Sequence, residues 1–136
     1  MSEEVKINFR MKINQNNEEQ IIEFNSLGKR YVKGLSTYLL FEEPVMEVNQ
    51  VNKVTCIYSQ EQLTIIRNGF TNMRQNYVLN ELSFGFYQTP YGQIETHAMT
   101  CRYEYNEDEL SLEYHLIINE EKVGNYKLKL QIKGVE

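Results

Sequence analysis

The chain of 136 residues has the length of one domain and can bury an apolar core without a disulfide or a structural metal. Its 14 basic and 19 acidic residues leave a net charge of −5, which repels phosphate backbones and argues against a nucleic-acid partner. No stretch approaches the roughly 20 apolar residues of a membrane span, and the N-terminus lacks the pattern of a signal peptide. We therefore expect one cytoplasmic domain over residues 1–136.

The first half of the chain has the period-two alternation of half-buried strands. Val5, Ile7, Phe9, Met11 and Ile13 alternate with polar residues and predict the first strand. Further strands are predicted over residues 20–25, 37–43, 52–59 and 62–68. A polar loop over residues 14–19 and a tight turn over residues 59–61 are typical of hairpins.

The second half continues the same alternation. It predicts strands over residues 76–86, 93–105, 110–118 and 126–132, which makes about nine in all. Short polar turns at residues 106–108 and 119–121 join the last three. No segment has the apolar spacing of a helix of ten or more residues, so parallel strands with helical crossovers are excluded and the sheet must be antiparallel.

These elements predict an all-β fold, an antiparallel up-and-down meander barrel of about 8–10 strands. Closing the barrel removes the exposed strand edges. The alternative is a two-sheet sandwich, which usually needs longer crossings than these turns provide. A barrel of this size is either filled by its own side chains or holds one small ligand.

The two faces of the strand over residues 93–105 lead to different interiors. One face presents Ile94, Thr96, Ala98, Thr100 and Arg102. It would leave a partly polar cavity if it points inward. The other presents Glu95, His97, Met99, Cys101 and Tyr103, which would fill the centre. Periodicity does not choose between them.

Charged residues on apolar strand faces are the candidate site. Arg67 shares a face with Leu63 and Ile65, and Glu42 shares one with Tyr38 and Leu40. One interpretation pairs Arg67 with Glu42 as a structural bridge, because an isolated buried charge is costly. In the other, Arg67 and Arg102, with the hydroxyls of Tyr38 and Tyr114, bind the carboxylate or phosphate of a ligand.

The stretch "FYQTPYGQ" (86–93) holds one of the two prolines. Pro90 and Gly92 occupy the second and fourth positions of Thr89-Pro90-Tyr91-Gly92, which is typical of a type I turn. A proline cannot join a paired central strand, so we expect a corner between two strands. Tyr91 would then lie on a rim of the barrel.

Four sequence features resemble the YwiB-like family of uncharacterised proteins from Bacillus and related Firmicutes. They are "YLLFEEP" (38–44), "IIRNG" (65–69), "YQTPYG" (87–92) and Thr100, in the family's order and spacing. The resemblance covers nearly the whole chain. It implies a calycin-like barrel, as in lipocalins and fatty-acid-binding proteins, but no catalytic residues. The chain has no Trp and so lacks the Gly-x-Trp signature of lipocalins, and it has no room for the helical lid of fatty-acid-binding proteins.

Catalytic patterns are missing from the sequence. His97 and His115 lack the spacing of a zinc site, and no nucleophile elbow or phosphate loop is present. Cys101 and His97 share a strand face, but about 13 Å of strand separates their Cα atoms, too far for a nucleophile and its base. Cys56 and Cys101 are expected to be reduced and buried. We expect no enzyme, cofactor or metal.

The favoured function is a cytoplasmic module that binds one small amphipathic, hydrophobic or anionic ligand inside the barrel. Its tentative site is Arg67, Arg102, Glu42, Tyr38, Tyr114, Thr96 and Thr100. The alternative is a filled barrel that acts as a protein-interaction or scaffold module, including self-association into a homodimer. The ten tyrosines and six phenylalanines, more than so small a core readily hides, support this alternative.

Overall fold

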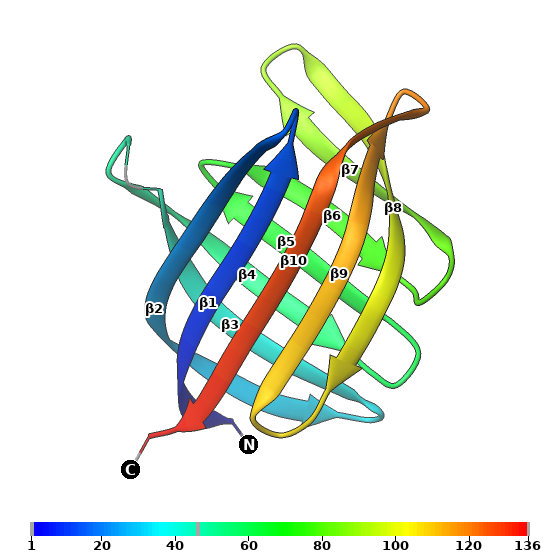
Figure 1. The fold of residues 1–136 in the computed structure, drawn as a ribbon. Helices are drawn as coiled ribbons and strands as arrows, with labels where there is room; N and C mark the ends of the chain where they lie inside the picture. Colours follow the sequence, from blue (N-terminus) through cyan, green and yellow to red (C-terminus); the bar gives the residue numbers. More distant parts are fainter. Residues whose placement is uncertain (1, 46, 136) are drawn as a thin grey trace.

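The computed structural model describes residues 2–45 and 47–135 and places ten strands in one closed antiparallel barrel (Figure 1). Each strand pairs with its neighbours in the chain, and β1 closes the barrel against β10. The strands are β1 (Glu3–Gln15), β2 (Glu18–Lys33), β3 (Ser36–Val45), β4 (Gln50–Tyr58), β5 (Leu63–Gly69), β6 (Asn72–Tyr77), β7 (Leu82–Thr89), β8 (Gly92–Tyr105), β9 (Glu109–Ile118) and β10 (Glu121–Gly134). The predicted up-and-down meander is confirmed.

Asparagine sets several of the hairpin turns, since it tolerates the left-handed backbone better than other residues with a side chain. Asn16 and Asn17 form the two-residue loop between β1 and β2 with φ of 50° and 64°. Asn119 and Glu120 do the same between β9 and β10. Two consecutive residues with positive φ match the right-handed twist of the flanking strands, so these loops close tight hairpins.

The predicted strand over residues 76–86 is wrong. Its residues belong to the end of β6 and most of β7, and Val78–Glu81 turns between them. Asn80, at the centre of this turn, has a φ of 64° and donates its backbone N–H to the carbonyl of Thr100. Because Val78 and Leu79 are apolar, the hydrophobic pattern of the sequence does not show this turn.

The core fills the barrel. It consists of inward-facing residues from eight strands, with β2 adding the half-buried Phe24. The buried apolar residues are Val5, Ile7, Phe9, Met11, Leu39, Phe41, Val54, Cys56, Tyr58, Leu63, Ile65, Tyr77, Ala98, Tyr103, Leu110, Leu112, Tyr114, Leu128, Leu130 and Ile132. The two-residue alternation of the strands therefore produces one continuous interior, closed around its circumference.

The barrel has two distinct ends. The lower end in Figure 1 holds both chain termini and the hairpin between β2 and β3, and the upper end holds the hairpins β1–β2, β7–β8 and β9–β10. The residues that the structure describes contain no helix, so none of them forms a helix that could cross a membrane.

Candidate functional site

An ion pair lies inside the upper part of the barrel, between β3 and β5. The Glu43 carboxylate accepts hydrogen bonds from Arg67 Nε at 2.9 Å and from Arg67 Nη2 at 3.2 Å. Asn52 Nδ2 also donates to Glu43 Oε1 at 3.0 Å. The side chains of Arg67 and Glu43 are only 16% and 14% exposed. Burial opposes the charge on Arg67, but Glu43 outweighs it and raises the guanidinium pKa.

The sequence predicted Glu42 as the partner of Arg67, which is wrong: the partner is the next residue, Glu43. Leu39 and Phe41 point into the core, so Glu43 shares their inward face, and Tyr38 and Glu42 point outward. Tyr38 stacks on Tyr31 outside the barrel, with ring centroids 4.9 Å apart. The sequence interpretation placed Tyr38, Leu40 and Glu42 on the inner face, and neither Tyr38 nor Glu42 can reach an interior ligand.

Strand β8 changes its facing at a bulge, where the register with β9 shifts between Thr100 and Arg102. Thr96 and Thr100 point inward and are buried, as the first of the two predicted faces requires. After the bulge Tyr103 points inward instead of Arg102. Arg102 is exposed and pairs with Glu104 at 3.2 Å and Glu113 at 3.3 Å. It is therefore wrong as an interior anchor, because the extra residue at Cys101 reverses the alternation.

Tyr114, another predicted site residue, lies in the core beside Tyr77. Their ring centroids are 4.7 Å apart, and Tyr126 stacks on Tyr114 with ring centroids 5.0 Å apart. Burial raises the pKa of Tyr77 to about 12 and raises that of Tyr114 as well. Both tyrosines therefore stay neutral at physiological pH, and their hydroxyls are neutral polar groups near Arg67.

Thr100 carries a buried hydroxyl without a hydrogen-bond partner among the described residues. Thr96, two residues earlier on the same face, is satisfied: its hydroxyl donates to Gln75 Oε1 at 2.6 Å. A buried hydroxyl without a hydrogen-bond partner is uncommon in folded proteins. The inner wall formed by β8 thus contains one satisfied and one unsatisfied threonine.

The lower end of the barrel is sealed. Val5, Leu39, Leu63 and Leu110 form its inward-facing layer and are fully buried. Tyr103 closes this layer by donating its hydroxyl to the carbonyls of Ser59 at 2.5 Å and Gln62 at 3.1 Å. Outside this layer lies a hollow of about 290 Å³, which Arg30, Thr37, Tyr58 and Tyr105 help to line.

The upper end is less closed, although its residues face the same interior. Ile22, Tyr87 and Ile94 belong to the inward-facing sets of their strands and are 38%, 41% and 38% exposed. Ile13, Met73, Leu116 and Tyr126 are half-buried around them. Ile94 belongs to the first predicted face of the strand over residues 93–105, but the others were not predicted as site residues. Alternation shows which side chains share a face but not at which depth of the barrel they lie.

The proline corner joins β7 to β8 at this upper end, as predicted. The hydroxyl of Thr89 accepts a hydrogen bond from the backbone N–H of Tyr91 at 3.2 Å and donates to the carbonyl of Gly92 at 2.8 Å. Gly92 has a φ of 131°, which a residue with a side chain rarely adopts. Tyr91 is 98% exposed and points away from the barrel. The corner is a structural turn beside the half-open end.

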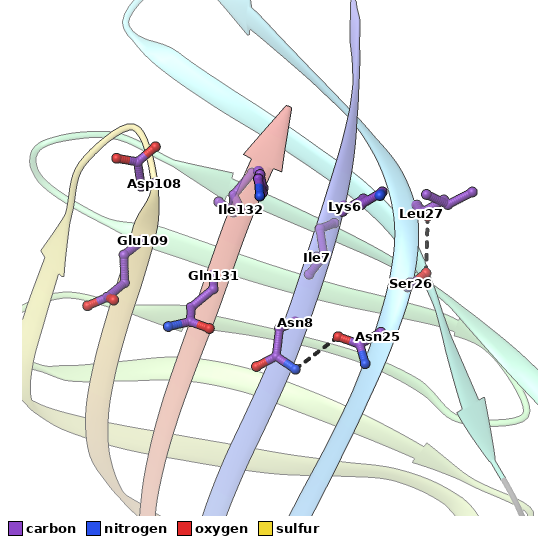
Figure 2. A pocket seen from close by; sticks show the side chains of 11 residues that line it. Lys6, Ile7, Asn8, Asn25, Ser26, Leu27, Asp108, Glu109, Gln131 and Ile132 are labelled. Carbon is purple, nitrogen blue, oxygen red and sulfur yellow. Dashed lines mark hydrogen bonds between the residues drawn. The ribbon is translucent and has the colours of Figure 1, made fainter. Parts of the chain in front are cut away.

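Two further hollows lie on the outside of the barrel. One, of about 770 Å³, crosses β2, β1, β10 and the start of β9 (Figure 2). Polar side chains such as Asn8, Asn25 and Gln131 line it, and Figure 2 shows the hydrogen bond between Asn8 and Asn25. The other, of about 680 Å³, lies between β2 and β3 on the far side of Leu27. Neither contains Arg67 or the residues of the half-open end.

The histidine and cysteine side chains are dispersed over the barrel. His97 approaches Glu95 at 3.5 Å, and His115 contacts Asn125. Cys56 is buried as predicted and burial raises its pKa to about 12, whereas Cys101 is exposed at the bulge, contrary to prediction. Among the described residues, no three His, Cys, Asp or Glu side chains gather in a group that could hold a metal ion.

Comparison with known proteins agrees with this architecture. Residues 7–130 match the family described as a domain of unknown function, DUF1934. The chain is 24% identical to the uncharacterized β-barrel protein YwiB of Bacillus subtilis, over 98% of this chain and 97% of that protein. The crystal structure of ywiB protein from Bacillus subtilis superposes with a TM-score of 0.84 at 19% identity, covering 99% of this chain and 94% of that chain. The expected resemblance to the YwiB-like family is confirmed.

Proposed function

This chain belongs to the DUF1934 family, and we propose that it is a non-enzymatic binding protein that takes the apolar part of one small amphipathic ligand at the upper end of the barrel. The difference between the two ends supports this proposal. The lower layer is fully buried, whereas Ile22, Tyr87 and Ile94 face the interior and remain more than a third exposed. Inward-facing apolar side chains that water can reach are typical of ligand sites in small barrels.

The charge around Arg67 favours a ligand with an uncharged polar head over an anion. Glu43 already accepts from Nε and Nη2 of Arg67, and the third nitrogen, Nη1, contacts the Met73 sulfur at 3.8 Å. An incoming carboxylate would lie close to Glu43, and two carboxylates that share one site repel each other. The Arg67–Glu43 ion pair has no net charge, so an amide or hydroxyl head group can bind beside it without displacing Glu43.

A titration with three ligands of equal chain length tests the proposal. We expect octanamide to shift the backbone amide resonances of Ile22, Tyr87 and Ile94 in 15N-labelled protein, and to bind at least three times more tightly than octanoate or octylamine. Ile94→Ser should weaken octanamide binding about tenfold. Leu82→Ser is the matched control, because Leu82 is 53% exposed on the outer face of β7.

Two results would overturn the proposal. If octanamide shifts resonances only on the outer face, or if Leu82→Ser weakens binding as much as Ile94→Ser, the upper end is not the site. If octanoate binds most tightly and shifts the Arg67 side-chain resonance, Glu43 exchanges with the ligand and the head group is an anion.

A further inference from the structure

Strand β2 has a free edge along its first ten residues. It pairs with β1 over Glu18–Arg30, but with β3 only over Gly28–Lys33. On the side of β3, residues 18–27 have no ladder partner among the described strands. Figure 1 shows β2 and β3 together near the lower end and diverging toward the upper end. The backbone groups on this edge of β2 are therefore available to another strand.

This edge has few of the features that protect a free strand against pairing. Proteins block free edges with Pro, charged side chains (Lys above all), a bulge or a very short strand. The charged residues of this edge are Glu18, Glu19 and Glu23, which repel acidic strands but not basic ones. Residues 18–27 contain no Pro, Gly, Lys or Arg, and the ladder between β1 and β2 is continuous. Across the gap from β2, the end of β3 contains Pro44, which has no backbone N–H and therefore limits strand pairing there. The contrast indicates that only the edge of β2 is suited to accept a strand.

A partly apolar hollow lies where β2 and β3 separate. It has a volume of about 680 Å³. Its apolar lining is Leu27, Leu40, Phe41 and Val54, and its charged lining is Glu4, Lys29, Glu42 and Lys53. Leu27 is 71% exposed, and Leu40 is 36% exposed. A strand added to the edge of β2 would bring its last side chains to this hollow. An apolar side chain there would cover surface that water now contacts.

The charged residues near the free edge of β2 favour one kind of partner strand over another. Glu18 and Glu23 on β2 and Glu42 on β3 are exposed and form no ion pair with another described residue, whereas Glu19 is paired with Lys12 at 3.0 Å. Neither residues 18–27 nor residues 36–45 contain Lys or Arg. The lysines at the hollow are Lys29 and Lys53, and Lys53 lies opposite Glu42, so the uncompensated negative charge is that of Glu18 and Glu23. A second copy of this chain would bring the same glutamates together across the new pair, which is unfavourable. A basic segment would be attracted to them.

We propose that the free edge of β2 binds an extended basic segment of a partner protein by strand addition, with one apolar side chain of that segment in the hollow between Leu27 and Leu40. Backbone hydrogen bonds to residues 18–27 would supply the affinity, and the glutamates and the hollow would supply the specificity. This interaction surface is separate from the upper end of the barrel interior, so it does not depend on the proposed ligand.

The probe is the acetylated and amidated peptide Lys-Leu-Lys-Val-Lys-Leu-Lys. We expect it to slow hydrogen exchange of the backbone amides within residues 18–27. The variant E18K/E23K should bind the peptide at least tenfold more weakly. The double variant E61K/E81K makes the same change in net charge at exposed turn residues away from β2 and should bind as the parent protein does. Methylation of alternate backbone nitrogens on one edge of the peptide should abolish binding.

Other outcomes would overturn the proposal. Equal weakening in E18K/E23K and E61K/E81K would mean that binding follows net charge alone. Protection confined to other strands, or unchanged binding of the N-methylated peptide, would exclude strand addition at β2. If the amides of residues 18–27 become protected as protein concentration rises without any peptide, the occupant of the edge is a second copy of this chain.

Discussion

Glu43 binds Arg67 through two guanidinium nitrogens, at 2.9 and 3.2 Å, inside a barrel whose other inward-facing residues are mostly apolar. Asn52 holds the same carboxylate from β4, and its own Oδ1 accepts the backbone N–H of Thr71 at 2.8 Å. The pair therefore ties β3, β4 and β5 to the turn that follows β5. Glu42 and Glu43 point to opposite faces of β3: Glu43 is mostly buried and paired, whereas Glu42 is solvated.

Removing one member of this pair should be costly, because it leaves the other as an uncompensated buried charge. We expect Arg67→Met to lower the free energy of unfolding by about 3–5 kcal/mol. The double variant Arg67→Met with Glu43→Leu should lose less than Arg67→Met alone, because it leaves no orphaned charge. Urea denaturation of the two single variants and the double variant measures the coupling. Additive losses would contradict an interaction between the two side chains.

The hydroxyl of Thr100 is buried without a hydrogen-bond partner, so we expect its removal to stabilise the protein. Thr100→Val keeps the shape of the side chain and removes a buried polar group without a partner, so we expect a gain of about 1 kcal/mol. Thr96→Val is the control: it breaks the hydrogen bond to Gln75 and should cost about 1–3 kcal/mol. If Thr100→Val destabilises the protein as much as Thr96→Val does, the Thr100 hydroxyl has a partner, such as a bound water.

The ten strands differ in how well the sequence predicted them. The first strand and the last two were found because their alternation is uninterrupted and polar turns bound them. Strand β2 was predicted over residues 20–25 but extends to Lys33. Gly28 and the charged Lys29 and Arg30 interrupt its apolar pattern. Arg30 nevertheless belongs there, since it binds Glu3 at the lower end of the barrel.

The candidate site was harder to predict than the fold. Arg67 was identified because a charge on an apolar face needs a partner, and it has one. Choosing between Glu42 and Glu43 required the facing of β3, which depends on Leu39 and Phe41 rather than on Tyr38 and Leu40. Both sets alternate and both are apolar, so the period does not separate them. The bulge at Cys101 adds one residue that no hydrophobic pattern reveals, and it moved Arg102 outside.

Gly28 marks the point where β2 meets β3 and should not tolerate a side chain. A Cβ atom at this position would lie 2.5 Å from the carbonyl oxygen of Leu40 and 2.7 Å from Ile7 Cδ1. The carbonyl belongs to the backbone of the neighbouring strand and cannot move without breaking the ladder. We expect Gly28→Ala to destabilise the protein by about 1–3 kcal/mol and to speed hydrogen exchange in residues 28–33. At Gly134 the nearest atom would be 3.9 Å away, so Gly134→Ala should be nearly neutral. Similar losses in both variants would contradict the close approach.

Burial raises the pKa of Cys56 from 9.0 and that of Tyr77 from 10.0, each to about 12, and predicts loss of stability at alkaline pH. In the unfolded chain these groups lose their protons near pH 9 and 10, while in the folded protein they keep them. Their contribution is therefore fully present below pH 9 and is lost as the pH rises from 9 toward 12. Each group can contribute a slope of about 1.4 kcal/mol per pH unit within its window.

Urea denaturation midpoints should be constant from pH 7 to 8.5 and fall steadily from pH 9.5 to 11. Tyr77→Phe removes one titrating group and should make the fall shallower above pH 10, whatever its effect at neutral pH. An equally steep fall in Tyr77→Phe would contradict a role for Tyr77.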